Sequence, residues 1–278
     1  MGVRPRESDD SAGHVRGKFS YVAMADKSRT WRFAPTAGED GDTYSIGMQI
    51  KCDSSPSTTD QLPEFTTRFQ NFVADKGFPC VGAKSALNRG RLEFGLYDAL
   101  TEERDVASMC SRRAAFSASH PAAGVDPVSF VAMFRRPTAS EQVFHATLWA
   151  HLQAMHELDR IEHPWDATVS ADVDDKEFSF SVAARAFFVV GLHPGASRMA
   201  RRAPFPCLVF NFHDQFEALR ASGRYEKMQT ATRGRDIAVQ GNINPVLARF
   251  GEASEAQQYS GLASAARGAC PFHARQAS

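Results

Sequence analysis

Apolar residues follow two spacings along this chain, one typical of strands and one typical of helices. Strand-like segments, in which apolar residues alternate with polar ones or form short runs, lie at 91–100, 127–134, 177–182, 184–193 and 207–212. Helical spacing appears at 63–77, from 101 onward, at 140–161 and at 213–223. Because the two kinds of segment do not alternate strictly, the pattern predicts an α+β (mixed α/β) fold with one central mixed sheet flanked by helices.

The same pattern predicts the boundaries of the packed region. Residues 1–60 are rich in Ser, Asp, Gly and Thr, so we expect a mostly flexible segment with a short edge strand at 43–50. Packed structure should begin at Pro63, and residues 63–272 should form a single domain followed by a tail, 273–278. Further expectations concern single elements: a helix capped by Thr101, a helix ended by Gly223, a loop at 235–245, and an apolar helix side made of Phe144, Leu148, Leu152, Met155 and Leu158.

Composition excludes several classes of protein. With 32 basic and 32 acidic residues the formal net charge is zero, so no electrostatic footprint for nucleic acid is present. No stretch approaches the ~20 apolar residues that span a bilayer, and the first residues lack the apolar core of a secretory signal. The five cysteines are scattered and indicate reduced thiols. We therefore expect a cytoplasmic protein without nucleic-acid or membrane partners.

Candidate chemistry concentrates around two histidines that end predicted strands. The apolar runs 186–192 and 206–212 end on His193 and His213. Between them stand three arginines, Arg198, Arg201 and Arg202. Haem iron accepts a histidine ligand and haem propionates pair with arginine, so the pattern predicts a haem pocket at the strand ends. The turn that Pro194 and Gly195 predict after His193 would fix its ring, which favours His193 as the ligand.

Other ligand sets stay open at this point. Cys80 in GFPC and Cys270 in ACPF are cysteines with a defined local context, and a thiolate ligand on haem favours O–O cleavage. His193 and His213 together with a carboxylate would instead suit a non-haem metalloenzyme. A further set, His145, His156 and His163, shares one helix face, but spacings of ~10 to 16 Å at 1.5 Å per residue exclude one shared ion.

Six segments, taken with their order and spacing, resemble the YqcI/YcgG family. They are GFPC (77–80), FFVVGLHPGASR (187–198), LVFNFHDQFEALR (208–220), RGRDIAVQGNINP (233–245), EAQQYSG (255–261) and CPF (270–272). The resemblance covers roughly residues 63–272. It implies a haem b enzyme that uses dioxygen and an external reductant to N-hydroxylate a small guanidine- or amine-containing substrate, as members on routes to D-cycloserine and guanitoxin do.

The chemistry of such an enzyme assigns roles to particular residues. His193 is the expected axial ligand, with His213 and then Cys80 as alternatives, and the three arginines are expected to pair with the propionates. A cationic substrate needs a fixed carboxylate, which we expect from Glu217 or, failing that, Asp236, with the amide of Asn211 nearby. No GxGxxG fingerprint opens a strand–helix unit, so an external electron donor is expected. A non-catalytic haem-binding or gas-sensing protein is the alternative.

Overall fold

The computed structural model describes residues 58–121, 124–244, 250–262 and 270–275. The strands are β1 (Leu92–Tyr97), β2 (Ser129–Phe134), β3 (Phe180–Val182), β4 (Arg185–Leu192) and β5 (Cys207–Phe212). The helices are α1 (Thr58–Ala74), α2 (Val81–Asn88), α3 (Glu103–Ser119), α4 (Glu141–Asp159), α5 (His213–Ala221), α6 (Tyr225–Gln240) and α7 (Ala256–Tyr259), with a 3-10 turn η1 (Met199–Arg201). The strands form one sheet in the order β1-β2-β5-β4-β3, parallel between β1 and β2 and antiparallel elsewhere. The predicted α+β fold with a central mixed sheet is confirmed.

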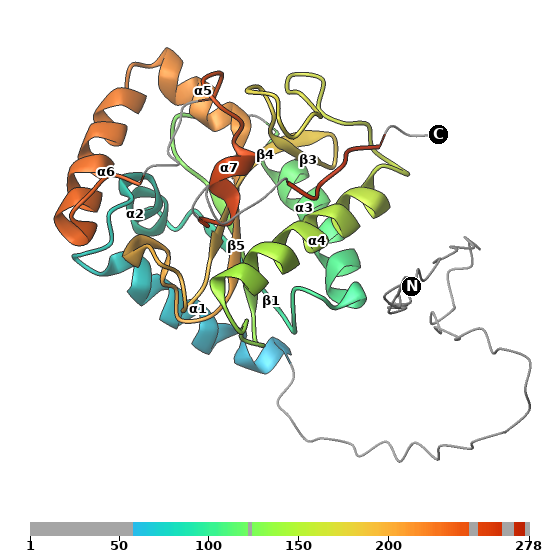
Figure 1. Ribbon diagram of the computed structural model, residues 1–278, viewed down its shortest axis with the longest axis horizontal. Coiled ribbons are helices and arrows are strands. Elements are labelled where there is room, and N and C mark those ends of the chain that lie inside the picture. The colour runs from blue at the N-terminus through green and yellow to red at the C-terminus, as the bar shows by residue number, and fades with distance from the viewer. Residues whose placement is uncertain (1–57, 122–123, 245–249, 263–269, 276–278) are drawn as a thin grey trace, which may run out of the picture. The chain divides into compact units, whose positions relative to one another are not determined.

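Helices cover both faces of this sheet (Figure 1). Successive side chains of a strand point to opposite faces of the sheet. Because both faces are covered, all six residues of β2 are buried. Phe130 and Phe134 pack into the core beneath α3 and α4, whereas Val131 and Met133 pack into a second core beneath α1. A strand covered on both faces needs this continuous apolar run.

Helix α4 shows how closely the sequence pattern matches the structure. The Ser140 hydroxyl caps it by accepting a hydrogen bond from Val143 N at 3.2 Å. Its predicted apolar side is buried at Phe144, Leu148, Leu152 and Met155, but Leu158 is 42% exposed, so that part of the prediction was wrong. None of the helices in the described ranges is long and apolar enough to cross a membrane.

Several boundaries differ from the predicted ones. Helix α1 begins at Thr58 and contains Pro63. The N-cap position of α3 is Glu102 instead of Thr101, and the Glu102 side chain makes no capping hydrogen bond. Helix α6 continues to Gln240 and ends at Gly241, whose φ of 81° only glycine adopts easily, so the loop predicted for 235–240 was wrong. Helices α2 and α7 were not predicted, whereas Gly223 ends α5 as expected. The predicted edge strand at 43–50 lies outside the described residues.

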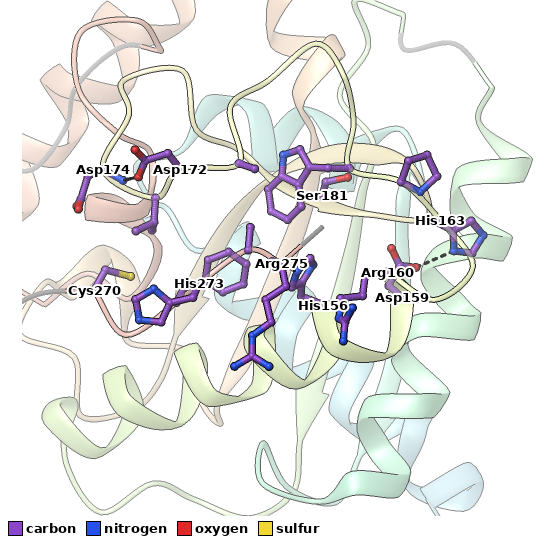
Figure 2. Close-up of a pocket in the computed structure, with 16 residues that line it drawn as sticks. His156, Asp159, Arg160, His163, Asp172, Asp174, Ser181, Cys270, His273 and Arg275 are labelled. Atoms are coloured by element: carbon purple, nitrogen blue, oxygen red, sulfur yellow. Dashed lines mark hydrogen bonds and ion pairs between the residues drawn. The ribbon is translucent and has the colours of Figure 1, made fainter. Parts of the chain in front are cut away.

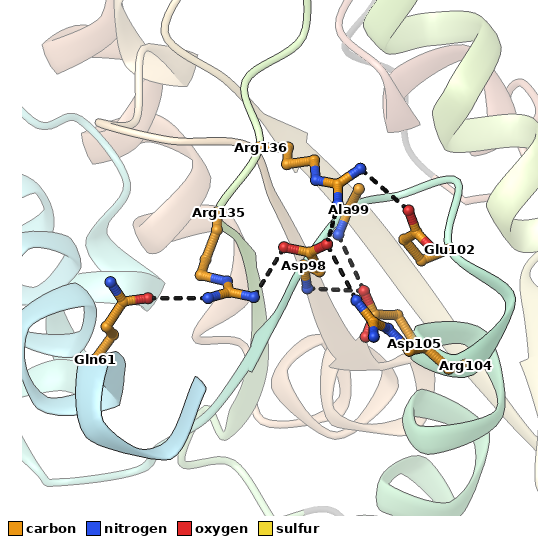
Figure 3. A network of polar contacts seen from close by, with 8 residues as sticks. All are labelled: Gln61, Asp98, Ala99, Glu102, Arg104, Asp105, Arg135 and Arg136. Carbon is orange, nitrogen blue, oxygen red and sulfur yellow. Dashed lines mark hydrogen bonds and ion pairs between the residues drawn. The ribbon is translucent and has the colours of Figure 1, made fainter. Parts of the chain in front are cut away.

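An ion-pair network fixes the edge of the sheet where β1 and β2 run parallel (Figure 3). Asp98 directly follows β1, and Arg135 and Arg136 directly follow β2. The Asp98 carboxylate pairs with Arg135 at 2.9 Å and with Arg136 at 2.6 Å. Asp105 of α3 accepts hydrogen bonds from the backbone N–H groups of Asp98 and Ala99 at 2.7 and 3.0 Å. These bonds join the ends of two strands to the start of α3.

Candidate functional site

A cavity of about 280 Å³ lies between the sheet and the helices α1, α2, α5 and α6. Strand side chains form its floor: Leu92 of β1, Ser129 and Val131 of β2, Phe188, Val190 and Leu192 of β4, and Val209 and Asn211 of β5. The surrounding helices contribute mainly apolar side chains, such as Phe69, Phe216 and Met228. The cavity therefore lies over one face of the sheet, not at the strand ends where the sequence placed it. Largely apolar walls with a few polar groups are typical of sites for small molecules and cofactors.

Cys80 contributes a thiol to this wall. It is the N-cap of α2, and its Sγ accepts a hydrogen bond from Ala83 N at 3.4 Å. Burial raises the pKa of the Cys80 thiol, while the N–H groups of Ala83 and Gly82 and the charge of Arg235 act in the opposite direction. The backbone N–H groups at a helix N-terminus and a nearby arginine stabilise negative charge on a cysteine sulfur. They would therefore stabilise the Cys80 thiolate when a metal ion replaces its proton.

A second cavity of about 210 Å³ adjoins the first. The two share eight lining residues, namely Cys80, Gly82, Phe188, Phe216, Leu219, Met228, Thr232 and Arg233. The wall of the second cavity is completed by residues that include Tyr225, Phe250, Glu255 and Gln258. Cys80 therefore lines two adjoining spaces with different linings: strand side chains form the floor of the first, and Glu255 lies in the wall of the second.

The three predicted arginines have three different environments. The Arg198 guanidinium pairs with the Asp236 carboxylate in the wall of the first cavity and also donates to the Asn242 carbonyl at 3.0 Å. Arg202 lies outside the cavity and donates to the Ala196 carbonyl at 2.7 Å. Asp236, a predicted substrate-binding carboxylate, is therefore already neutralised by Arg198.

Arg201 is buried and lines the first cavity. Its guanidinium donates to the carbonyls of Gly191 and Tyr259, each at 3.0 Å, and of Gln258 at 2.6 Å. Burial lowers the pKa of Arg201 to about 10. Because carbonyls bind the guanidinium without cancelling its charge, Arg201 brings a positive charge to the cavity wall.

Arg233 was not selected from the sequence, yet it lines both cavities. Its Nε is buried and has no hydrogen-bond partner among the described residues. An unpaired buried donor costs free energy, so its presence in a cavity wall indicates a site for an acceptor. Sequence reasoning missed Arg233 because α6, the helix that carries it, was not predicted.

His193 lies outside both cavities. It is 1% exposed and stacks on Phe144 of α4, with the ring centroids 4.3 Å apart, so it packs on the side of the sheet that α4 covers. Burial lowers the pKa of His193, and its Nε2 has no hydrogen-bond partner within the described ranges. The sequence therefore located a buried histidine at a strand end, and the structure separates it from Cys80.

His213 and Glu217 lie near one another at the start of α5. The Nε2 of His213 is 3.7 Å from Glu217 Oε1, and its Nδ1 is 3.7 Å from Glu255 Oε1; both distances exceed a hydrogen bond. The Glu217 side chain is 50% exposed, pairs with Arg220 and lines neither cavity. Glu217, the predicted substrate carboxylate, is thus directed away from the space that Cys80 lines.

Asn211 lies in the floor of the first cavity, as its strand position requires. Its Oδ1 accepts from Ser129 Oγ at 2.7 Å across the β2–β5 pair, and its Nδ2 donates to the Phe188 carbonyl at 3.1 Å. Both ends of the amide are therefore occupied by the sheet, and its contribution is to hold three strands together beneath the cavity.

A separate cavity of about 770 Å³ lies at the end of α4, against β3 and the segment 270–275 (Figure 2). His156, His163 and Cys270 line it. The fold already uses both histidines: His156 Nε2 accepts from Arg275 N at 2.8 Å, and His163 Nδ1 lies 2.9 Å from an Asp159 carboxylate oxygen. In the described part of the chain, no three His, Cys, Asp or Glu side chains form a metal-binding group. This gives the non-haem alternative no support.

Comparison with known proteins adds one match. The model of the YqcI/YcgG family matches residues 69–273, which include the two cavities that Cys80 lines and every candidate residue named above. No curated protein and no solved structure matches the chain.

Proposed function

The chain belongs to the YqcI/YcgG family, and from that premise we propose that it is a haem-dependent N-hydroxylase of a small guanidine- or amine-containing substrate. The observation that carries the proposal is the position of Cys80, whose sulfur lines an apolar cavity with unmatched positive charge in its wall. Dioxygen and an external electron donor would complete the reaction. The four cysteines within the described ranges, Cys80, Cys110, Cys207 and Cys270, are free thiols, which supports a cytoplasmic location.

The residues of the cavity fit haem b in three respects. The macrocycle is apolar, and so are the sheet floor and most of the helix side chains above it. The iron needs a protein ligand, for which Cys80 is placed. The propionates need cationic partners, and Arg233 and Arg201 have no carboxylate partner within the described ranges. The ligand assignment therefore moves from His193 to Cys80, the third candidate from the sequence.

Thiolate-ligated haem, when bound, supplies the activation of dioxygen. The side chains of this chain have other tasks. Leu92, Val131 and Val190 exclude water from the floor of the cavity. The N–H of Ala83 stabilises negative charge on Cys80 Sγ, and Arg235 adds to this effect through its charge. The cationic substrate must be held by a carboxylate close to this cavity.

The test of the proposal is haem binding by variants of the full chain expressed with ample haem. The wild-type protein should carry haem in stoichiometric amount in a pyridine haemochrome assay and show the ferrous–CO band of a thiolate ligand. Cys80→Ala should lose that band, whereas His193→Ala should keep it, since His193 lies on the opposite side of the sheet. Absence of haem from the wild type would refute the proposal. A wild-type ferrous–CO spectrum of the histidine type that is lost in His193→Ala and kept in Cys80→Ala would return the ligand role to His193.

Turnover tests the reaction itself. Under aerobic, reducing conditions the haem-loaded protein should convert arginine-like substrates to products heavier by one oxygen atom. A haem-loaded protein that oxidises no guanidine or amine would support the gas-sensing alternative.

A further inference from the structure

Glu255 is a buried carboxylate in the wall of the second cavity. It is 5% exposed, and its Oε2 is shielded from solvent without a hydrogen-bond partner in the described part of the chain. Removing a carboxylate from water costs several kcal/mol unless a charge or donor replaces the water. A carboxylate in this state, facing a space large enough for a small molecule, indicates a missing cationic partner.

The neighbouring side chains do not supply that partner. His213 Nδ1 is 3.7 Å from Glu255 Oε1, beyond hydrogen-bonding distance, and it has no other partner among the described residues. Arg220 is bound by Glu217 and lies over the Tyr225 ring at 4.8 Å from its centroid. The remaining cation of this wall, Arg233, lines the boundary with the Cys80 cavity and forms no ion pair that would neutralise Glu255.

The rest of the wall suits an organic cation. Four aromatic side chains surround the second cavity: Phe188, Phe216, Tyr225 and Phe250. Phe188 and Phe216 meet edge to face, with centroids 5.8 Å apart, and Phe250 packs against His213 with centroids 4.3 Å apart. Aromatic faces attract ammonium and guanidinium groups through the ring quadrupole, and they do so most strongly away from water. A carboxylate with aromatic neighbours therefore selects a cation that carries some apolar surface.

The other acidic candidates near this site are excluded by their contacts. The Asp236 carboxylate is held by Arg198, and the Glu217 side chain is half exposed and held by Arg220. Among the acidic side chains that line the two cavities, only Glu255 is buried with a carboxylate oxygen that has no hydrogen-bond partner in the described part of the chain. Since Cys80 and Thr232 line both cavities, a ligand held at Glu255 lies beside the space proposed for the cofactor.

We propose that Glu255 and the aromatic wall of the second cavity form the subsite that holds the guanidinium group of a small guanidino compound. Glu255 is a positioning and selectivity residue, since its carboxylate binds the cation next to the Cys80 cavity. The assignment of this ligand as the substrate rests on the proposed function; the binding of the cation does not.

Direct binding measurements test the subsite without turnover. Isothermal titration of the purified full chain should show binding of L-arginine and much weaker binding of L-citrulline, whose side chain is a neutral urea of similar shape and whose α-amino and α-carboxyl groups are the same. Glu255→Gln removes the charge at nearly constant volume and should weaken arginine binding by about 10- to 100-fold, the range for losing a charge-assisted hydrogen bond. The same variant should bind citrulline as the wild type does. Glu226 is an exposed carboxylate on α6, so Glu226→Gln is the matched control and should bind both compounds as the wild type does.

The outcomes separate this subsite from the proposed function. Equal binding of arginine and citrulline by the wild type would overturn the subsite, even if Glu255→Gln failed to fold. Loss of arginine binding in Glu217→Gln but not in Glu255→Gln would also overturn it. Equal weakening of both ligands by Glu255→Gln would show a merely structural role. Haem content is measured separately, so a protein that binds arginine through Glu255 but takes up no haem would refute the proposed function and leave the subsite intact.

Discussion

At the scale of single residues, the side chains that matter most for the site are buried polar groups without partners. Arg233 and Glu255 belong to this class, and both were missed in the sequence because nothing in their local patterns distinguishes them from exposed residues. Glu255 is buried next to α7, which the hydroxyl of Tyr259 anchors to the sheet by bonds to Phe180 N and the Phe187 carbonyl. Cys80, in contrast, was among the sequence candidates because GFPC gave it a defined context.

Arg113 belongs to the same class but lies in a packed core instead of a cavity. It is fully buried on α3, its guanidinium carbon is 3.0 Å from the centroid of the Phe130 ring, and none of its nitrogens has a hydrogen-bond partner in the described part of the chain. Burial lowers the pKa of Arg113 well below its usual range. The aromatic contacts offset only part of the loss of hydration.

Replacing Arg113 by methionine should therefore stabilise the protein. We expect Arg113→Met to raise the free energy of unfolding by about 1–3 kcal/mol, because an apolar side chain of similar length removes an unpaired buried charge. Urea denaturation followed by circular dichroism measures this. The neighbouring exposed arginine provides the control, and Arg112→Met should change stability by less than about 0.5 kcal/mol. A clear loss of stability in Arg113→Met would mean that the guanidinium is needed where it lies.

At the scale of elements, the Arg198–Asp236 pair joins the connection between β4 and β5 to α6. Asp236 also accepts from Asn244 N at 3.3 Å, and Met199 N donates to Gln240 Oε1 at 2.9 Å. These bonds hold the end of α6 against η1, beside the cavity that Cys80 lines. The sequence predicted that Asp236 lies in a loop at the site. In the structure Asp236 does line the cavity, but it belongs to α6 and pairs with Arg198.

Breaking this pair from one side should cost more than removing it. Asp236→Ala leaves the buried Arg198 charge unpaired and should lower the free energy of unfolding by about 3–5 kcal/mol. The double variant Asp236→Ala/Arg198→Met should recover most of that loss, which a double-mutant cycle of denaturation measurements would detect. If the two single changes simply add, the two side chains are not coupled and α6 is held by its other contacts.

At the scale of the whole molecule, the periodicity of apolar residues was sufficient to predict the fold class. The continuous apolar runs of β2 and β4 and the alternation in β1 located these strands within a few residues. Helix α6 was not predicted, because Gly241 and Asn242 indicate a loop locally, while tertiary contacts such as Val81 N to Thr232 Oγ1 at 3.3 Å stabilise the helix. The cavity could not be predicted, since it depends on how helices from both ends of the domain pack over one sheet face.

Buried histidines predict how the stability of the whole domain depends on pH. His151 of α4 lies in the core with its Nδ1 2.6 Å from the Leu100 carbonyl, so the neutral ring donates there, and burial lowers the pKa of His151 to about 4. Burial also lowers the pKa of His156 and of His193. These histidines bind a proton near pH 6.5 in the unfolded chain but only at lower pH in the folded chain. Their contribution to the free energy of unfolding is therefore complete above pH 6.5 and decreases as the pH falls towards the pKa of the folded state.

We therefore expect the free energy of unfolding to be lower at pH 5 than at pH 7.5, with His151 alone contributing about 2 kcal/mol of the difference. Urea titrations of the wild type and of His151→Gln at both pH values test this. Glutamine retains a donor for the Leu100 carbonyl but does not titrate, so the variant should lose about 2 kcal/mol less than the wild type over the same interval. Identical pH dependence in the two proteins would mean that His151 becomes protonated in the folded state as readily as in the unfolded chain. The core between α3 and α4 would then admit the charge that its packing is expected to exclude.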